Sequence, residues 1–193
     1  YVEDSTTGQR VTDYTHDVRG RVLLQENPES PHAFHKVDNM GRRLATGMFS
    51  STASISVSSD DPTTETANRL ALSEVAYDEL GRAWKTTRHK IDAADGSDDD
   101  TLLTENWYDE EGRVIKADGE QLRKTSYDSL GRATLVSILA SDDDTGYSDA
   151  DDVMGDRVLE ERQSVYDPTS GDLSLTAVVQ RFHDDEGSGE TTG

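Results

Sequence analysis

The chain has 193 residues, of which 32% are hydrophobic, and carries a formal net charge of −21 at pH 7. This charge argues against nucleic acids and anionic membrane surfaces as partners, because both are bound through clustered lysine and arginine. The absence of cysteine excludes disulfides, thiolate catalysis and cysteine-ligated zinc. A mean hydropathy of −0.77 favours a thin sheet with a solvated face over a compact globule.

Along the chain an Asp is followed repeatedly, three residues later, by a Gly. In chain order the pairs are Asp17 and Gly20, Asp38 and Gly41, Asp78 and Gly81, Asp109 and Gly112, and Asp128 and Gly131, with a form one residue longer at Asp167 and Gly171. This spacing predicts a type I turn in which the Asp side chain accepts backbone hydrogen bonds. The Gly then takes the left-handed conformation that closes a three-residue hairpin loop.

The segments on either side of these turns favour β-strands. Short runs rich in aromatic and β-branched residues precede the turns at 74–77, 106–108 and 164–166, and follow them at 82–86, 113–116 and 132–136. A tyrosine stands immediately before the Asp in four copies, at Tyr77, Tyr108, Tyr127 and Tyr166. We expect each ring to pack on a neighbouring hairpin. We expect the Arg that follows the Gly to bridge to an acidic residue of the adjacent hairpin.

Between these tips the chain turns back. Asp118-Gly119 predicts a two-residue hairpin loop, a proline-containing return lies at 26–31, and longer returns rich in Ser, Thr or Asp lie at 58–66, 92–100 and 141–155. A meander places every tip on one rim and every return on the other. Residues 172–183 are either one long strand or two strands joined near Thr176-Ala177.

The acidic returns are the candidate metal sites. Their candidate calcium ligands are Asp95, Asp98 and Asp100 in one return and Asp142, Asp144, Asp149 and Asp151 in another. Calcium prefers clustered carboxylate and carbonyl oxygens, but neither return has EF-hand spacing. The alternative is a solvated acidic loop.

The sequence offers no catalytic constellation, and we expect no enzyme activity. It lacks a Gly-x-Ser-x-Gly elbow and a glycine-rich phosphate loop. His32 and His35 lie in a predicted strand, where residues three apart point to opposite faces. Trp84 and Trp107 suit either core packing, which we favour, or a sugar-stacking platform.

The Tyr-Asp-x-x-Gly-Arg tips at residues 77–82, 108–113 and 127–132, with the Tyr-Asp-Pro-x-x-Gly variant at 166–171, resemble the YD repeat, also called the RHS repeat. The resemblance covers most of the chain and implies an all-β strip of antiparallel hairpins, part of a spiralling shell of the kind found in bacterial toxin complexes, polymorphic toxins and teneurins. It lacks the Asp-Pro context of the family's aspartyl autoprotease, and the long acidic returns depart from a compact repeat.

The resemblance implies a non-catalytic wall segment that encloses or displays another part of the same polypeptide, such as a C-terminal effector domain. The alternative is a cell-surface adhesion or glycan-binding module, assisted by calcium in the acidic returns. We expect one repeat array over residues 1–186, with 187–193 a flexible tail or continuation into the next repeat, cut from a longer chain. Its expected partners are neighbouring repeats and an enclosed domain, or glycans and surface proteins. Secretion or cell-surface display is implied by the resemblance, without membrane insertion by this segment.

Overall fold

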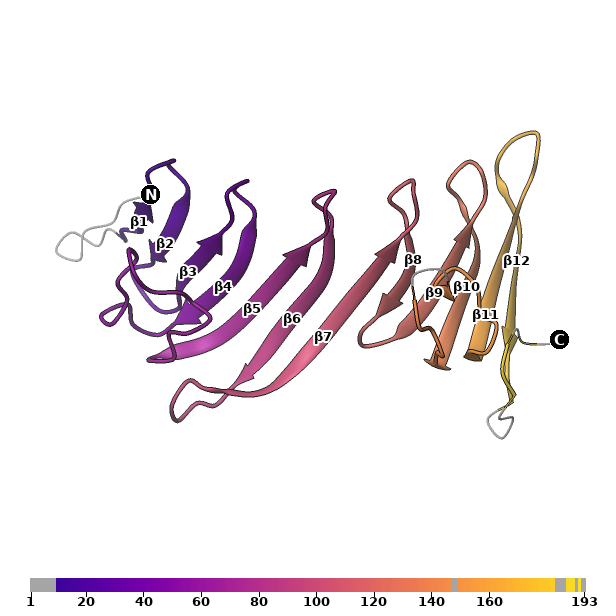
Figure 1. The fold of residues 1–193 in the computed structure, drawn as a ribbon. Helices are drawn as coiled ribbons and strands as arrows, with labels where there is room; N and C mark the ends of the chain where they lie inside the picture. Colours follow the sequence, from indigo (N-terminus) through magenta and orange to yellow (C-terminus); the bar gives the residue numbers. More distant parts are fainter. Residues whose placement is uncertain (1–9, 147–148, 183–186, 190, 192–193) are drawn as a thin grey trace. The chain divides into compact units, whose positions relative to one another are not determined.

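The computed structural model describes residues 10–146, 149–182, 187–189 and 191 (Figure 1). These residues form one antiparallel sheet of twelve strands whose spatial order follows the chain, and they contain no α-helix. The strands are β1 (Asp13–His16), β2 (Val22–Glu26), β3 (His32–Val37), β4 (Arg43–Phe49), β5 (Arg69–Tyr77), β6 (Ala83–Ile91), β7 (Asp98–Tyr108), β8 (Val114–Asp118), β9 (Leu122–Tyr127), β10 (Ala133–Ser141), β11 (Arg157–Tyr166) and β12 (Leu173–Gln180). The predicted all-β hairpin strip is confirmed at this level.

The chain divides into two compact units, Tyr1–Leu103 and Thr104–Gly193. In each unit the Asp-Gly tips join an odd-numbered strand to the next even-numbered one, and the returns join even to odd. Antiparallel pairing in chain order therefore places the tips of a unit on one rim and its returns on the other (Figure 1). Within the described residues, no helix is long and apolar enough to span a bilayer.

Strands that belong to different hairpins pair only in part. β4 and β5 pair from Ala45↔Glu74 to Phe49↔Arg69, and β8 and β9 pair at Lys116↔Lys124 and Ala117↔Arg123. The ladder between neighbouring hairpins thus stops before it reaches the tips. Side chains must connect the hairpins there.

The core of the first unit is apolar. Leu24, Phe34 and Phe49 are buried together, and the return at 50–68 lays Ile55 and Val57 against them. Burial of three large apolar side chains removes enough surface from water to hold this return on the sheet.

The second unit has a polar row in the corresponding place. Lys116, Lys124, Ser137 and Glu161 are cross-strand neighbours on β8 to β11. All four are buried. Because cross-strand neighbours lie on one face of a sheet, the return at 142–156 meets charged side chains instead of apolar ones.

Two local expectations are resolved by the strand boundaries. Residues 173–180 form one strand, so the alternative of a turn near Thr176 is wrong. The two-residue loop expected at Asp118-Gly119 is also wrong, because three residues separate β8 from β9 and Gly119 is not left-handed. A Cβ at Gly119 would lie 2.9 Å from Oγ1 of Thr104, so close packing on β7 explains this glycine.

We expected the repeat array to end at residue 186, with residues 187–193 as a tail or as the start of the next repeat. The structure describes this end of the chain only in part. Residues 1–9, 183–186, 190 and 192–193 lie outside the described residues. Of the remainder, Gly189 forms a parallel bridge with Arg157, and the Thr191 hydroxyl donates to Oε2 of Glu161 at 2.5 Å.

Candidate functional site: hairpin tips and acidic returns

The five short tips share one hydrogen-bonded arrangement around the Asp carboxylate. At the first tip, Oδ1 of Asp17 accepts the N–H of Arg19 at 2.8 Å and of Arg21 at 3.0 Å, and Oδ2 accepts Nε–H of Arg21 at 2.6 Å. The bonds from the Arg backbone and Nε recur at Asp38, Asp78, Asp109 and Asp128. The turn Asp thus fixes both the loop backbone and the Arg side chain.

The tip glycines have the left-handed backbone that the turn requires. Their φ angles are +78° at Gly20, +87° at Gly41, +82° at Gly81, +85° at Gly112, +80° at Gly131 and +80° at Gly171. A side chain with a Cβ is strained in this region. The glycine is therefore a requirement of the loop geometry.

Hydrogen bonding lowers the pKa of the tip carboxylates. The side chain of Arg21, followed by its backbone N–H, lowers the pKa of Asp17 to about 2. At Asp128 the backbone N–H of Arg132 is the main cause of a lowered pKa. At Asp38, Asp78 and Asp109 burial raises the pKa, but hydrogen bonds from the following Arg outweigh it and the net shift is downward. These groups are ionised under all mild conditions.

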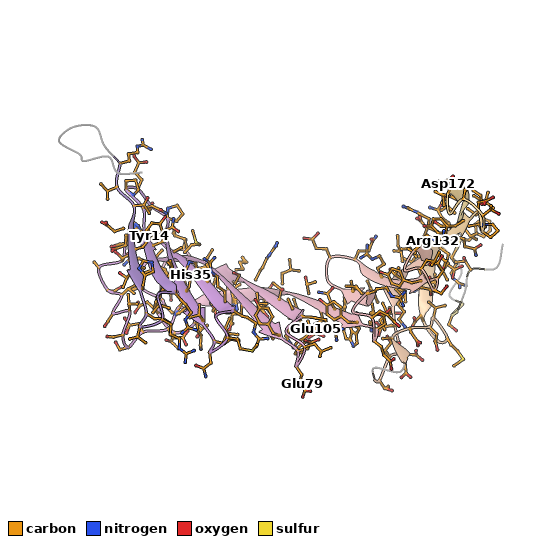
Figure 2. The ribbon with its side chains drawn as sticks, turned by 90° about the horizontal axis from the view of Figure 1, so that it is seen from above. Tyr14, His35, Glu79, Glu105, Arg132 and Asp172 are labelled. Atoms are coloured by element: carbon orange, nitrogen blue, oxygen red, sulfur yellow. The ribbon has the colours of Figure 1, made fainter. Side chains whose placement is uncertain are left out.

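The ion pairs described for the tip arginines lie within their own turns, whereas the expectation was a bridge to the next hairpin. Each ion-pairs with the Asp of its own turn, because the turn brings residues i and i+4 together. The rest of the guanidinium reaches forward: Nη1 of Arg113 donates to the carbonyl of Asp128 at 3.2 Å, and Nη1 of Arg132 to that of Gly171 at 3.0 Å. Figure 2 shows Arg132 near the tip that carries Asp172.

The tyrosines complete the connection between hairpins. Tyr77, Tyr127 and Tyr166 donate their hydroxyls to the carbonyls of Arg43, Val114 and Ala133, on the preceding hairpin, at 3.2, 3.0 and 3.1 Å. The guanidinium carbons of Arg42, Arg113 and Arg132 lie 4.6, 4.9 and 4.3 Å from the centres of these rings, within cation–π range. We call one Arg with the following Tyr a tip pair. Tip pairs replace the backbone ladder where the strands splay.

The sixth tip keeps the turn but changes the side chain that reaches forward. Oδ1 of Asp167 accepts the N–H groups of Thr169 and Ser170 at 2.7 and 2.8 Å. Asp172 stands where the short tips carry Arg, and its carbonyl accepts from the N–H of Asp167 at 2.7 Å. The carbonyl of Gly171 at this tip accepts a hydrogen bond from the guanidinium of Arg132. The tip itself carries Asp172 at the position of the arginine.

The acidic return at 142–156 closes around a lysine. Nζ of Lys124 donates to Oδ1 of Asp144 at 2.7 Å and to the carbonyls of Asp149 and Asp152 at 3.0 and 2.6 Å. It also lies 2.7 Å from Oδ2 of Asp156. Four oxygens thus surround an ammonium that is almost fully buried.

A second buried lysine lies beside it. Nζ of Lys116 contacts Asp142 and lies 2.7 Å from Oδ2 of Asp144, while also standing 4.6 Å from the centre of the Trp107 ring. Burial lowers the pKa of Lys116, but the bonds to Asp142 and Asp144 outweigh it and the net shift is upward. Lys124 behaves in the same way with Asp144 and Asp156. Asp156 has a raised pKa, chiefly because it is buried.

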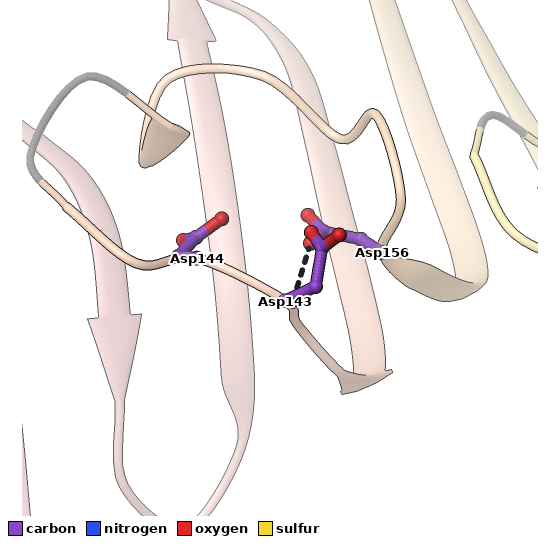
Figure 3. A group of neighbouring side chains, drawn as sticks. All are labelled: Asp143, Asp144 and Asp156. Atoms are coloured by element: carbon purple, nitrogen blue, oxygen red, sulfur yellow. Dashed lines mark hydrogen bonds between the residues drawn. The ribbon is translucent and has the colours of Figure 1, made fainter.

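Asp143, Asp144 and Asp156 bring carboxylate oxygens within 4.8 Å of one another (Figure 3). Among the candidate calcium ligands, Asp142 and Asp144 belong to this region, whereas Asp149 contributes its backbone carbonyl to Lys124. Asp151 lines a groove beside Tyr127. Asp156 is the fully buried member of this group. Asp144 and Asp156 both contact lysine, so they are not simply solvated carboxylates.

The candidates of the earlier return have separate partners. Asp95 accepts the N–H of Ser97 at 2.9 Å, and Asp100 accepts that of Thr101 at 2.7 Å. Asp98 lies 2.7 Å from Nη2 of the buried Arg69. The remaining guanidinium hydrogens of Arg69 go to the carbonyls of Pro62, Thr63 and Gly96, at 3.0 to 3.3 Å. The sequence analysis missed both Arg69 and the two lysines.

Among the described residues, the tryptophans and histidines of each unit have separate surroundings. Trp84 is 37% exposed, which contradicts the favoured core position for this residue. Trp107 belongs to the other unit and is partly covered by Lys116. His35 is buried with Nδ1 3.1 Å from Oγ1 of Thr46, so it has a hydrogen-bonding partner within the sheet.

Grooves follow the splayed strands between hairpins. They measure about 470 Å³ beside Tyr77, about 400 Å³ beside Tyr127 and about 300 Å³ beside Val37. Each is lined by the residue before the turn Asp and by the second residue after the Arg of the preceding tip, which is Leu44, Ile115 or Leu23. The grooves are therefore equivalent features of successive hairpins.

No protein-family model matches the sequence, and no curated protein matches it. Among solved structures it is similar to the crystal structure of TcdB2-TccC3-Cdc42, with 11% identity over 92% of this chain and a TM-score of 0.38. It is also similar to TcdB2-TccC3-TEV, at 10% identity, 88% coverage and 0.35. A third match, TcdB2-TccC3 without its hypervariable C-terminal region, has 11% identity, 87% coverage and 0.38. This chain spans about a tenth of each of those chains, and the likeness concerns the fold alone.

Proposed function

We propose that this chain is a non-catalytic stretch of β-sheet wall that encloses or displays another part of its own polypeptide. The observation that carries the proposal is the tip pair, because at three junctions it joins one hairpin to the next and engages the Arg and Tyr side chains in structural contacts. Arg132 illustrates this, with Asp128 on one side and Tyr166 and Gly171 on the other. The sequence resemblance to YD repeats supplies the expectation of a shell.

A wall needs stiffness more than it needs a pocket. Every tip pair crosses the gap at which the backbone ladder between hairpins has stopped. A cation–π contact contributes about 0.5–1 kcal/mol when exposed, and a hydrogen bond contributes about 0.5–1.5 kcal/mol. Repeated along a strip, such contacts restrict bending between hairpins, which suits a structural role outside the cell or on its surface.

The test is electron microscopy of a full-length protein that contains this segment. A hollow, closed particle with density inside supports enclosure of cargo by the wall. An open particle with the rest of the polypeptide on its outside supports display. A flexible particle in which this segment has no fixed curvature contradicts both forms of the proposal.

The alternative of a glycan-binding module has one observation in its favour, the exposed ring of Trp84 beside Lys85. A glycan array probed with the wild-type chain and with Trp84→Ala distinguishes the two functions. Binding that depends on Trp84 favours adhesion, whereas no binding by either protein favours the wall.

A further inference from the structure

One hairpin junction has the arginine of a tip pair but not the tyrosine. Val37 immediately precedes Asp38, the position that Tyr77, Tyr127 and Tyr166 occupy before their own turn Asp. The first tip nevertheless carries Arg21, which ion-pairs with Asp17 as the other tip arginines do with their Asp. The junction between β2 and β3 therefore lacks a ring by sequence.

The Arg21 side chain holds the same pose as the arginines of the complete tip pairs. Its Nη1 donates to the carbonyl of Asp38, as Nη1 of Arg113 does to the carbonyl of Asp128. Its Cδ lies 3.7 Å from a Cβ built on Gly41, and Cδ of Arg113 lies 4.0 Å from the corresponding atom at Gly131. Among the described residues, no aromatic ring lies over the guanidinium of Arg21.

The junction between β2 and β3 also has a backbone carbonyl at the position where the complete junctions bind the tyrosine hydroxyl. In the complete junctions the tyrosine hydroxyl donates to the carbonyl of the residue that follows the tip arginine, as Tyr127 does to Val114. The residue that follows Arg21 is Val22. Its partner in the register is His16, just as the partner of Val114 is Tyr108. The carbonyl of Val22 is thus placed as the other acceptors are.

A groove of about 300 Å³ opens at this junction, lined by Arg21, Leu23, Phe34 and Val37 among others. This volume is at the lower end of the range for small-ligand sites. Of the other charged groups that line it, Lys36 is paired with Asp61, and Asp60 accepts the backbone N–H of Ser56. The guanidinium face and the apolar side chains are left to recognise a ligand.

We propose that the groove between β2 and β3 binds a phenol ring, and that its ligand is a tyrosine side chain of another polypeptide. The ring lies under the guanidinium of Arg21 against Leu23 and Val37, and its hydroxyl donates to the carbonyl of Val22. Three tip pairs within the same chain provide the geometry of the occupied state. The site is independent of whether the strip forms a wall.

The first experiment titrates the isotopically labelled chain with N-acetyl-tyrosinamide and follows backbone amide shifts by NMR. Saturable shifts confined to Val22, Val37 and the tip around Asp38 are expected. N-acetyl-phenylalaninamide, which lacks the hydroxyl, should bind about five- to tenfold more weakly, the ratio that one hydrogen bond provides. Equal affinity for the two probes, or shifts spread over both units, overturns the proposal.

The second experiment fills the site from within. Val37→Tyr should complete the tip pair, abolish the probe-induced shifts and raise the melting temperature, whereas Val165→Tyr, at a half-exposed position on β11, should change neither. If Val37→Tyr does not fold, Arg21→Gln serves instead, and it should weaken probe binding about two- to fivefold through loss of the stacking face. Undiminished binding to a folded variant contradicts the site.

The source of the phenol is tested with p-cresol beside the pentapeptide Gly-Gly-Tyr-Gly-Gly. Binding of both supports a tyrosine side chain as the ligand. Binding of p-cresol alone contradicts that source, because the groove then excludes a polypeptide backbone. Binding of neither overturns the proposal altogether.

Discussion

The two units anchor their long returns by different physical means. In the first unit, Ile55 and Val57 of the return at 50–68 pack on Leu24, Phe34 and Phe49, and Arg69 donates to the carbonyls of Pro62 and Thr63 in the same return. In the second, residues 142–156 cover Lys116 and Lys124 through carboxylates. The first return rests on apolar contacts and on neutral carbonyl acceptors for Arg69, with one ion pair between Asp61 and Lys36. The second rests chiefly on ion pairs of Lys116 and Lys124 with carboxylates, together with two backbone carbonyls that accept from Lys124.

The largest expected effect is at the lysine inside the acidic return. Lys124→Met leaves Asp156 buried without its cation and leaves Asp144 with Lys116 alone, which should cost about 3–5 kcal/mol of unfolding free energy. Urea denaturation measures this cost. Lys90→Met removes an exposed ion pair with Asp99 and should cost no more than about 1 kcal/mol. Equal effects of the two substitutions would show that the burial of Lys124 has no energetic consequence.

A similar loss is expected in the apolar return. Phe49 is fully buried against Phe34, so Phe49→Ala should cost about 3–5 kcal/mol through lost burial and a cavity. Phe182 is 81% exposed, and Phe182→Ala is the control that should leave the urea midpoint nearly unchanged. We expect Phe49→Ala to increase hydrogen exchange in residues 50–68 and to leave residues 142–156 unaffected, which would show that the two returns are anchored independently.

A smaller effect is expected at a tip, which both units share. Gly81 has a φ of +82°, and Gly81→Val should cost about 1–3 kcal/mol because valine is strained there. Gly146 lies in open space without positive φ, so Gly146→Val is a matched control. Thermal unfolding of both variants measures the difference. A neutral Gly81→Val would mean that the turn relaxes to another loop type.

Alkaline pH should separate the two returns. The folded-state pKa values of Lys116 and Lys124 are raised, by partners that outweigh burial. Their contribution to stability is therefore present below the ordinary value of 10.5 and is lost as pH rises through the folded value. Hydrogen exchange above pH 10.5 should rise in residues 142–156 before it rises in residues 50–68, and simultaneous loss would contradict the ionic anchor.

Acid should act on the tips, with the smallest effect. The pKa of Asp17 is lowered to about 2, first by the Arg21 side chain. Its contribution is present above the unfolded value near 3.8 and is lost as pH falls through about 2. NMR of the Arg19 and Arg21 amides between pH 5 and pH 2 should follow this loss, and Asp17→Asn should remove the transition. A midpoint near the ordinary value would show that Arg21 does not stabilise the carboxylate.

Turn chemistry made the hairpins predictable. Asp at the first position and Gly at the fourth specify the loop through contacts within five residues, as Asp78 and Gly81 do. The Tyr before the turn was also predictable as an anchor on a neighbouring hairpin, and its hydroxyl donates to the preceding one. The target of the Arg was not predictable, because the same guanidinium can serve its own turn and the next one.

The buried cations that anchor the returns, Lys116, Lys124 and Arg69, could not be predicted from the sequence. Lys116 stands between Ile115 and Ala117 in a short strand, an alternation that indicates a solvated position for the lysine, and Lys124 stands in a polar run of its strand. The strand register sets them side by side, and the return that folds over them does so through contacts between residues 20 to 28 positions apart. Arg69 was missed for the same reason, since Gly96 and Asp98 lie 27 and 29 residues further along the chain.

The sequence by itself determined the repeating hairpins of this protein. Their Asp and Gly residues make contacts within a single turn, and their Tyr residues contact the neighbouring strand. Only the tertiary structure decided which charges are buried, which carboxylates have lysine partners and where a tip pair is incomplete. Those outcomes depend on burial and on long-range pairing. The ion pairs of the acidic return form only after the chain has folded back on its own sheet.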